Sequence, residues 1–237
     1  MVVRLKWFPP SWIQLKINQK IVYIDPAYMR TYYTKYPKKI EFSKWPDPID
    51  GLPEQLEKAD AILISHDHKD HVKAVTVNRL RRSDTLVLAP ERCKKILGSR
   101  INIIEPGNEL TIGTIRIKTV DAYNIEKAGS KKIWHRKGDG VGFLITADGK
   151  TIYHAGDTDF IPEMRDLGAV DVALLPIGGN YTMGIDDAVR AAIAINPKVV
   201  IPMHHLKANP LGFKNRLEAK SKIKAMLLQI GEVYYFH

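Results

Sequence analysis

Histidine and aspartate gather in one short segment of the chain, which reads HDHKDH from His66 to His71. Three of the eight histidines of the 237-residue chain lie in this segment, with Asp70 beside the last of them. Imidazole and carboxylate groups bind borderline divalent metals such as zinc. The spacing suits two adjacent metals, one bound by His66 and His68 and the other by Asp70 and His71. The alternative, a capping aspartate among surface histidines at a helix start, explains such clustering less well.

Two residues far along the chain could complete such a site, because each follows a predicted strand. Asp157 stands in HAGDTD, and its two carboxylate oxygens could bridge two ions. Alternatively, Asp157 is a structural residue of the Gly-Asp-Thr turn. His204 follows VVIPM, although its neighbour His205 competes for the role and either could be a hydrogen-bonded loop histidine. The single cysteine, Cys93, excludes an internal disulfide and a thiolate metal cluster, and we expect it to be a packed helix residue.

Strands and turns must position these candidate ligands, and hydrophobic periodicity predicts where those elements lie. The β-rich first half and the strand–helix–strand second half favour sheets flanked by helices. The histidine segment falls between a strand over 61–65 and a helix over 72–82, whose Val72, Val75 and Leu80 we expect to face inward. We further expect strands at 2–8, 12–17, 20–25, 85–89, 101–105, 109–120, 141–146, 152–154, 170–177 and 198–203, helices at 52–58, 186–195 and 214–228, and a long surface loop over 28–50.

Length and composition indicate a single globular domain over residues 1–237, since 45% of the residues are hydrophobic. The longest apolar runs are far shorter than the roughly 20 residues that span a bilayer. The N-terminus lacks the apolar segment of a secretory signal, so we expect no membrane association and a cytoplasmic location. The net charge of +10 favours anionic partners without choosing among RNA, phosphorylated metabolites and acidic surfaces. Aromatic residues in 28–45 could form an interface between copies of the chain, so a homo-oligomer is possible.

The motifs HDHKDH, HAGDTD and PMHH, in this order and spacing, resemble the successive metal motifs of the metallo-β-lactamase superfamily. YHAGDTD, LLPIGGNYTM and VIPMHH together look like a small stand-alone branch of metal-dependent hydrolases, related to the ascorbate-phosphate lactonase group. The resemblance covers nearly the whole chain and implies an α/β fold, a four-layer αββα sandwich with the site at the edge of its two sheets. It also implies that the metals are carried by His66, His68, Asp70, His71, Asp157 and His204.

One position departs from the superfamily pattern, because DAYN places Asn124 where a histidine is expected. His135, a short loop away in IWHRKGDG, could replace it as a metal ligand, as a similar segment in the related branch suggests. Alternatively His135 contacts substrate or solvent, and the enzyme is mononuclear. The residues expected to contact substrate are Asn124, His154, Tyr181 and Lys137, although His154 could be a buried hydrogen-bonded residue and the loop around Tyr181 could serve tight packing.

The expected function is that of a metal-dependent hydrolase, with two divalent ions, preferably zinc and otherwise manganese or iron. A hydroxide held by the metals would attack a small anionic ester, lactone or phosphodiester, and Asp70 would orient it and pass its proton to the leaving group. The basic loop with Lys131, Lys132, Arg136 and Lys137 would attract the anion. The main alternative is a nuclease acting on RNA or DNA, favoured by the charge. A metal-stabilised scaffold and a redox di-iron centre are less favoured, because the ligand set is nearly complete and no flavin-binding domain is visible.

Overall fold

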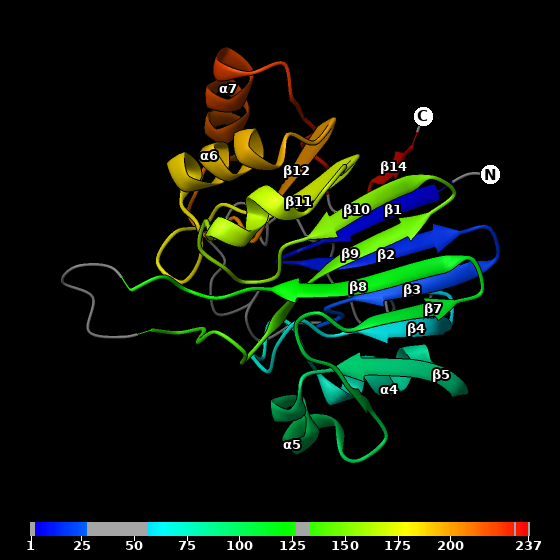
Figure 1. Cartoon of the computed structure of the whole chain (residues 1–237). Helices are drawn as coiled ribbons and strands as arrows, with labels where there is room; N and C mark the ends of the chain where they lie inside the picture. The colour runs from blue at the N-terminus through cyan, green and yellow to red at the C-terminus, as the bar shows by residue number, and fades with distance from the viewer. Residues whose placement is uncertain (1–2, 28–55, 127–132, 230, 237) are drawn as a thin grey trace. The chain divides into compact units, whose positions relative to one another are not determined.

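The computed structural model describes residues 3–27, 56–126, 133–229 and 231–236. The chain divides into two compact units, unit 1 with residues 1–104 and 228–237, and unit 2 with residues 105–227. Each unit is built on one seven-stranded sheet (Figure 1). The expectation of a single domain over 1–237 stays a prediction.

The sheet of unit 1 combines an antiparallel meander with a parallel half. The alternating N-terminal patterns form the meander, which confirms those predicted strands, and the last strand of the chain joins it at β1. From β3 onward neighbouring strands run parallel. In sheet order the strands are β14 (Val233–Tyr235), β1 (Val3–Phe8), β2 (Trp12–Ile17), β3 (Lys20–Ile24), β4 (Ala59–Leu63), β5 (Arg81–Ala89) and β6 (Asn102–Ile103).

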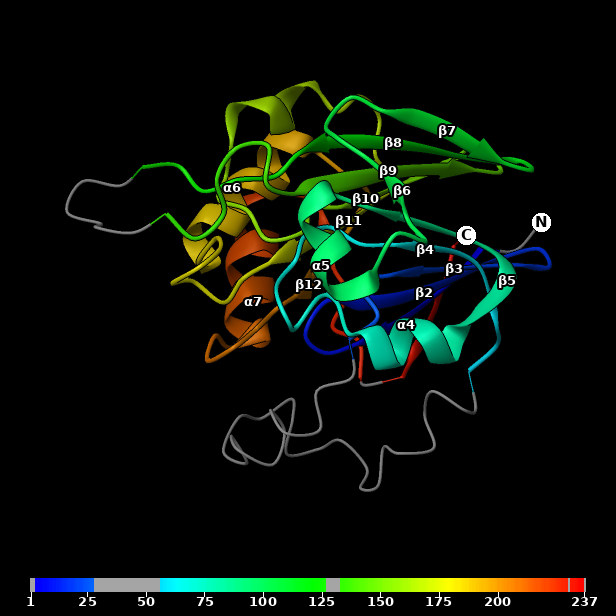
Figure 2. The ribbon, with the colours of Figure 1, turned by 90° about the horizontal axis from the view of Figure 1, so that it is seen from below.

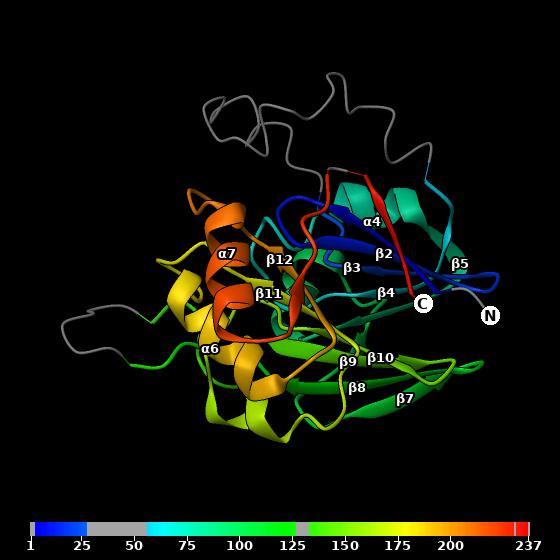
Figure 3. The ribbon, with the colours of Figure 1, turned by 90° about the horizontal axis from the view of Figure 1, so that it is seen from above.

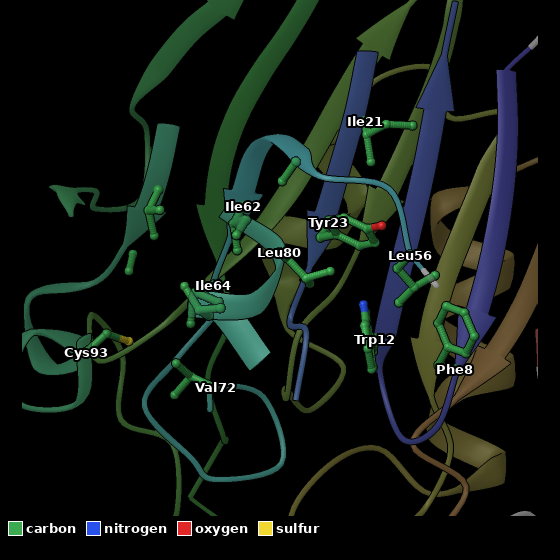
Figure 4. Packing of buried hydrophobic residues seen from close by; sticks show 14 residues of the cluster. Phe8, Trp12, Ile21, Tyr23, Leu56, Ile62, Ile64, Val72, Leu80 and Cys93 are labelled. Carbon is green, nitrogen blue, oxygen red and sulfur yellow. The ribbon is translucent and has the colours of Figure 1, made fainter. Parts of the chain in front are cut away.

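A hydrophobic core on one face of this sheet joins the meander to helix α4 (Ala74–Leu80), which Figure 2 shows beside the strands. Trp12, Tyr23 and Ile62 pack there with Leu80 of the helix (Figure 4). Burial of such side chains stabilises the unit by about 1.5–3 kcal/mol each. Cys93 belongs to the same cluster, in the short 3-10 helix η2 (Glu91–Cys93) that leads into α5 (Lys94–Leu97), as expected of a packed residue.

The inward face predicted for the helix after the histidine segment is wrong at Val75, which is 71% exposed. The N–H of Val72 donates to the carbonyl of His68, so these residues form a turn and the helix begins only at Ala74. Its buried face then comprises Thr76, Val77 and Leu80, while Val72 is buried ahead of the helix. Because residues five positions apart lie on different sides of an α-helix, Val75 and Leu80 cannot both face the core.

Unit 2 pairs an antiparallel half-sheet with a parallel one. Strands β7 to β10 are antiparallel, and β10 to β13 run parallel. Helices α6 (Ile185–Ile195) and α7 (Pro210–Lys220) pack against each other beside this parallel half (Figure 3). The strands are β7 (Glu109–Ile112), β8 (Ile115–Asp121), β9 (Val141–Ala147), β10 (Lys150–His154), β11 (Val172–Pro176), β12 (Val199–Met203) and β13 (Lys224–Ala225).

Most elements of unit 2 agree with the sequence prediction, with two corrections. The stretch 109–120 is a hairpin, because Gly113, with φ +61°, allows the chain to turn between β7 and β8. The helix expected at 214–228 instead runs from Pro210 to Lys220. It begins there because Asn209 caps it by accepting a hydrogen bond from the N–H of Leu211. The loop at 28–50 and most of the helix at 52–58 lie outside the described residues.

In each unit the parallel strands bring candidate site residues to one edge of the sheet. Asp25 directly follows β3, and the segment from Ser65 to His71 follows the adjacent parallel strand β4. In unit 2, Asp157 comes shortly after β10, and His204 follows β12, with β11 between them. The carboxyl ends of parallel strands are a common place for ligand-binding residues in α/β proteins.

Within the described ranges, no helix has the length and apolar character required to cross a membrane.

Val75 and Val77 offer a matched test of how α4 packs. Val77 is fully buried, so Val77→Ala should lower the free energy of unfolding by about 1–3 kcal/mol. Val75→Ala makes the same chemical change on the exposed side and should change it by less than about 0.5 kcal/mol. Denaturant unfolding of both variants measures the difference. Equal losses would show that the helix is packed by another face.

Candidate metal centre

The histidine segment of unit 1 is a tight turn that brings three imidazole rings together. The carbonyl of His68 accepts hydrogen bonds from the N–H groups of His71 and Val72, both 3.0 Å long. The ring of His66 lies 4.7 Å from that of His68 and 4.1 Å from that of His71, between ring centroids. Three imidazole rings therefore lie close together within one turn of unit 1.

A buried carboxylate and hydroxyl fix the orientation of two of these rings. Ser65 donates its N–H to Asp25 Oδ1 and its hydroxyl to Asp25 Oδ2, each over 2.6 Å. Asp25 Oδ2 also lies 2.7 Å from Nδ1 of His71, which donates to it. Since the Ser65 hydroxyl gives its proton to Asp25, it accepts from Nδ1 of His66 at 2.9 Å. Both histidines therefore carry their proton on Nδ1 and keep a lone pair on Nε2.

Asp67, within the same turn, anchors the histidine segment to the adjacent helical segment. Its Oδ2 lies 2.5 Å from Nζ of Lys95 and 3.6 Å from Nε of Arg92. Burial acts to raise the pKa of Asp67, but the hydrogen bond from Lys95 and the charge of Arg92 outweigh it and hold the pKa below its usual value. Asp67 is therefore ionised at neutral pH and serves the turn as an anchor.

In unit 2, Asp157 lies between two histidines at the edge of the sheet. Its Oδ2 is 3.4 Å from Nε2 of His204 and 3.6 Å from Nε2 of His135, and all three residues are buried. Ligand atoms about 2.0–2.2 Å from a tetrahedral zinc ion are about 3.4 Å apart, so these spacings fit such an ion. His205, the competitor of His204, instead hydrogen-bonds through Nε2 to the carbonyl of Pro202.

Asn124 clamps His135 in place. Its backbone N–H donates to the carbonyl of His135, and its Oδ1 accepts the backbone N–H of His135. Its Nδ2 donates to the carbonyl of Tyr181, which identifies Oδ1 as the acceptor side of the amide. Oδ1 also lies 3.0 Å from Nδ1 of His135, so that nitrogen carries the proton and Nε2, on the side of Asp157, keeps a lone pair that could bind a metal. The unexpected asparagine thus positions the histidine proposed to replace a ligand.

The backbone around His204 is held in an uncommon conformation. His204 has φ +47°, in the left-handed region that few residues other than glycine adopt. Gly178, which follows β11, allows this, because a Cβ there would lie 2.5 Å from the carbonyl oxygen of His204. Strained backbone of this kind is concentrated at functional sites.

The other residues expected to contact substrate have diverse surroundings. His154 is fully buried, and its Nδ1 accepts the N–H of Gly156 in the turn that leads to Asp157. Tyr181 is exposed. Lys137 hydrogen-bonds to Glu163, lies 3.5 Å from Asp121 and covers the ring of Tyr123. Its charge is therefore balanced by neighbouring carboxylates, and Lys131 and Lys132 lie outside the described residues.

Burial shifts the pKa values of two further titratable residues, Cys93 and His205. Burial raises the pKa of the Cys93 thiol to about 12, so it is not a nucleophile at neutral pH. Burial lowers the pKa of His205 to about 4, so that imidazole is neutral as it donates to Pro202.

The donor set of the described residues suits a borderline divalent metal. All the candidate donors are nitrogen or oxygen atoms, and Ser65, Asp25 and Asn124 orient three imidazoles so that Nε2 is available to a metal. The described residues that could hold a metal ion are His66, His68, Asp70, His71, His135, Asp157 and His204, the seven ligands expected from the sequence.

Comparison with known proteins identifies the family. The model of the β-lactamase superfamily domain matches residues 4–204. The chain belongs to this superfamily. It is 31% identical over 246 residues to a UPF0173 metal-dependent hydrolase of Anoxybacillus flavithermus, covering 97% of this chain and 98% of that protein. The chain therefore falls among the stand-alone metal-dependent hydrolases that the motifs resemble.

Solved structures agree. A protein of Parabacteroides distasonis assigned to the metal-dependent hydrolases superposes with a TM-score of 0.81 at 28% identity, covering 96% of this chain and 93% of that one. Igni18, a metallo hydrolase of the archaeon Ignicoccus hospitalis, gives 0.77 at 28% identity, covering 100% and 99%. The two mixed sheets with their helices thus have the metallo-β-lactamase fold, as the motifs implied.

Sequence reasoning missed Asp25 and Ser65, which orient His66 and His71. In the sequence, Asp25 stands at the end of the strand expected at 20–25. The available signal was its place directly after an apolar strand, the same place that singled out His204. Ser65 stands immediately before the histidine segment but carries no ligand chemistry of its own.

Replacing the orienting carboxylate tests the network of unit 1. Asp25 has φ +48°, which asparagine tolerates, so Asp25→Asn should keep the backbone. The amide leaves fewer acceptor sites for Ser65 and His71, and metal affinity should fall about 10–100-fold. Competition with a chromogenic chelator measures this. Asp60→Asn removes a carboxylate that binds Ile21 and Lys20 elsewhere in unit 1 and should leave the affinity unchanged. Unaltered affinity in Asp25→Asn would contradict the role of Asp25.

The contact between Asn124 and His135 in unit 2 leads to a separate prediction. Asn124→Ala removes the acceptor for Nδ1 of His135, so metal affinity should fall about 10–100-fold, and His135→Ala should cause at least the same loss. Asn108→Ala is the control, since Asn108 caps the N–H of Glu105 in another loop of unit 2. If His135→Ala binds metal like wild type, His135 is not a ligand.

Proposed function

We propose that the histidine segment of unit 1 and the three ligands of unit 2, His135, Asp157 and His204, hold two divalent metal ions, preferably zinc. The observation that carries this is the set of contacts at Nδ1 of His66, His71 and His135, each with an acceptor, which leaves Nε2 of each ring with a lone pair. Membership of a family of metal-dependent hydrolases supports the same assignment. Manganese or iron would suit the same donors.

We infer that the enzyme hydrolyses a small anionic ester, lactone or phosphodiester. Bound divalent ions supply an activated water at neutral pH and polarise the bond under attack. The chain contributes proton transfer, since Asp70 is half-buried within the histidine turn and can accept a proton from the nucleophile and pass it to the leaving group. The three oriented imidazoles keep their Nδ1 protons throughout, because Ser65, Asp25 and Asn124 accept them.

The preference for an anion rests on the charge of the chain, which is +10. The side chain of Arg136, next to His135, is exposed and makes no hydrogen bond or ion pair with another described residue, so it is an available cation. Lys137 is a weaker candidate, because Glu163 and Asp121 balance it.

A nuclease is the second candidate, because the same charge favours nucleic acid. The basic C-terminal region supports it less than its composition indicates, since Lys214 pairs with Glu218 and Arg216 with Asp186. Salt-sensitive binding of a generic oligonucleotide, with cleavage that a chelator stops, would favour the nuclease. A cytoplasmic location, the absence of a membrane partner and a homo-oligomer remain predictions.

Metal removal and Asp70→Asn test the proposed reaction together. A screen of lactones, phosphodiesters and thioesters should reveal hydrolysis that ceases with a chelator and returns with added zinc or manganese. Asp70→Asn should lower kcat by about 10²–10⁴-fold while the protein stays folded. Asp166→Asn, on the exposed surface of unit 2, is the matched control and should keep wild-type kcat. Hydrolysis indifferent to both the chelator and Asp70→Asn would disprove the proposal.

A further inference from the structure

An exposed aromatic pair lies next to the metal ligand proposed in unit 2. Trp134, immediately before His135, is 41% exposed, and Tyr181 is 39% exposed. Their rings meet edge to face, with 4.8 Å between centroids. Two more exposed apolar residues, Ile125 and Ile133, adjoin Asn124 and Trp134 in the chain. Clustered exposed apolar side chains of this kind usually mark a binding surface.

Asn124 ties this pair to His135. It binds the backbone of His135 on both sides and donates through Nδ2 to the carbonyl of Tyr181 over 2.9 Å. One asparagine therefore sets the positions of the proposed ligand, of Trp134 directly before it in the chain, and of Tyr181. A ligand group resting on the rings would be held in a fixed relation to His135, which binding to a loose surface would not provide.

We propose that Trp134 and Tyr181 form a platform for a flat, unsaturated ring carried by the substrate beside its anionic reacting group. This inference rests on the proposed function and names the substrate class. Edge-to-face packing leaves ring surface of both residues accessible, and aromatic rings favour stacked or tilted contact with another ring. Arg136, the next cation along the chain, suits the anionic part of the same molecule.

The ring could come from an aryl ester or from a nucleotide, because both offer an aromatic face. The metal ligands do not distinguish these sources, and aromatic platforms bind bases with little sequence preference. The shared chemistry is an aromatic ring a short distance from an anion.

Calorimetric titration of the metal-loaded protein with unreactive ligands tests the platform. Phenylphosphonate and methylphosphonate carry the same anion and differ in the ring, so wild type should bind the phenyl compound about tenfold more tightly, equivalent to about 1.4 kcal/mol. Trp134→Ala should reduce this ratio to near one, and Tyr181→Ala should reduce it in part. Trp134→Phe keeps a ring and should keep most of the preference. Comparing adenosine monophosphate with ribose 5-phosphate separates a base from an aryl group.

The matched control is Tyr235→Ala, which removes a tyrosine that is 46% exposed in unit 1 and should leave the ratio unchanged. Both platform residues are exposed, so their alanine variants should fold, and circular dichroism with thermal unfolding verifies this. A wild-type protein without preference for the ring, or a preference that survives Trp134→Ala, overturns the inference. A preference that depends on Trp134 in a protein without metal-dependent hydrolysis would instead overturn the proposed function and retain the platform.

Discussion

A neutral imidazole can offer a ligand lone pair on Nε2 only while Nδ1 keeps its proton, and this requirement governs the structure around the site. Each oriented histidine has its own acceptor, Ser65 for His66, Asp25 for His71 and Asn124 for His135. The acceptors differ in chemistry, as a hydroxyl, a carboxylate and an amide, yet each has its own donors committed elsewhere or has none to give. The result is the same protonation state in both units, reached by local contacts in each.

The sequence could predict which residues are candidate ligands but not what orients them. Ligand types and spacing are local, so HDHKDH, Asp157 and His204 could be recognised in the chain. Some of the contacts involved are distant in sequence, because Asp25 lies 46 residues from His71, and Asn124 is itself bonded to Tyr181, 57 residues away. Asp25 and Ser65 meet because the parallel strands β3 and β4, which they follow, are neighbours in the sheet. Asn124 stands out in the sequence because the superfamily pattern has a histidine at its position. Only the structure shows that its amide bonds to Tyr181 and to the backbone of His135.

The fold shows the same division between local and tertiary information. Strands of the meander follow from alternation, because each has one period and short turns. The inward position predicted for Val75 is wrong because Val75 and Leu80, five residues apart, lie on different sides of α4. The helix predicted at 214–228 begins too late in the sequence, because apolar spacing was given more weight than Asn209 followed by Pro210, which is a typical helix start. The family resemblance supplied the fold class, which the comparisons confirm.

The pairing of β14 with β1 has a consequence for biosynthesis. Unit 2 is one continuous stretch inserted into unit 1, whose sheet is completed by residues beyond residue 227 (Figure 1). During translation, the histidine turn and its strands leave the ribosome early, while the outer edge of β1 has no partner until all of unit 2 has been made. Unpaired edges invite pairing with other chains. Lys6 and Arg4 place charge on β1, and charged side chains on an edge strand disfavour its pairing with another chain before β14 is made.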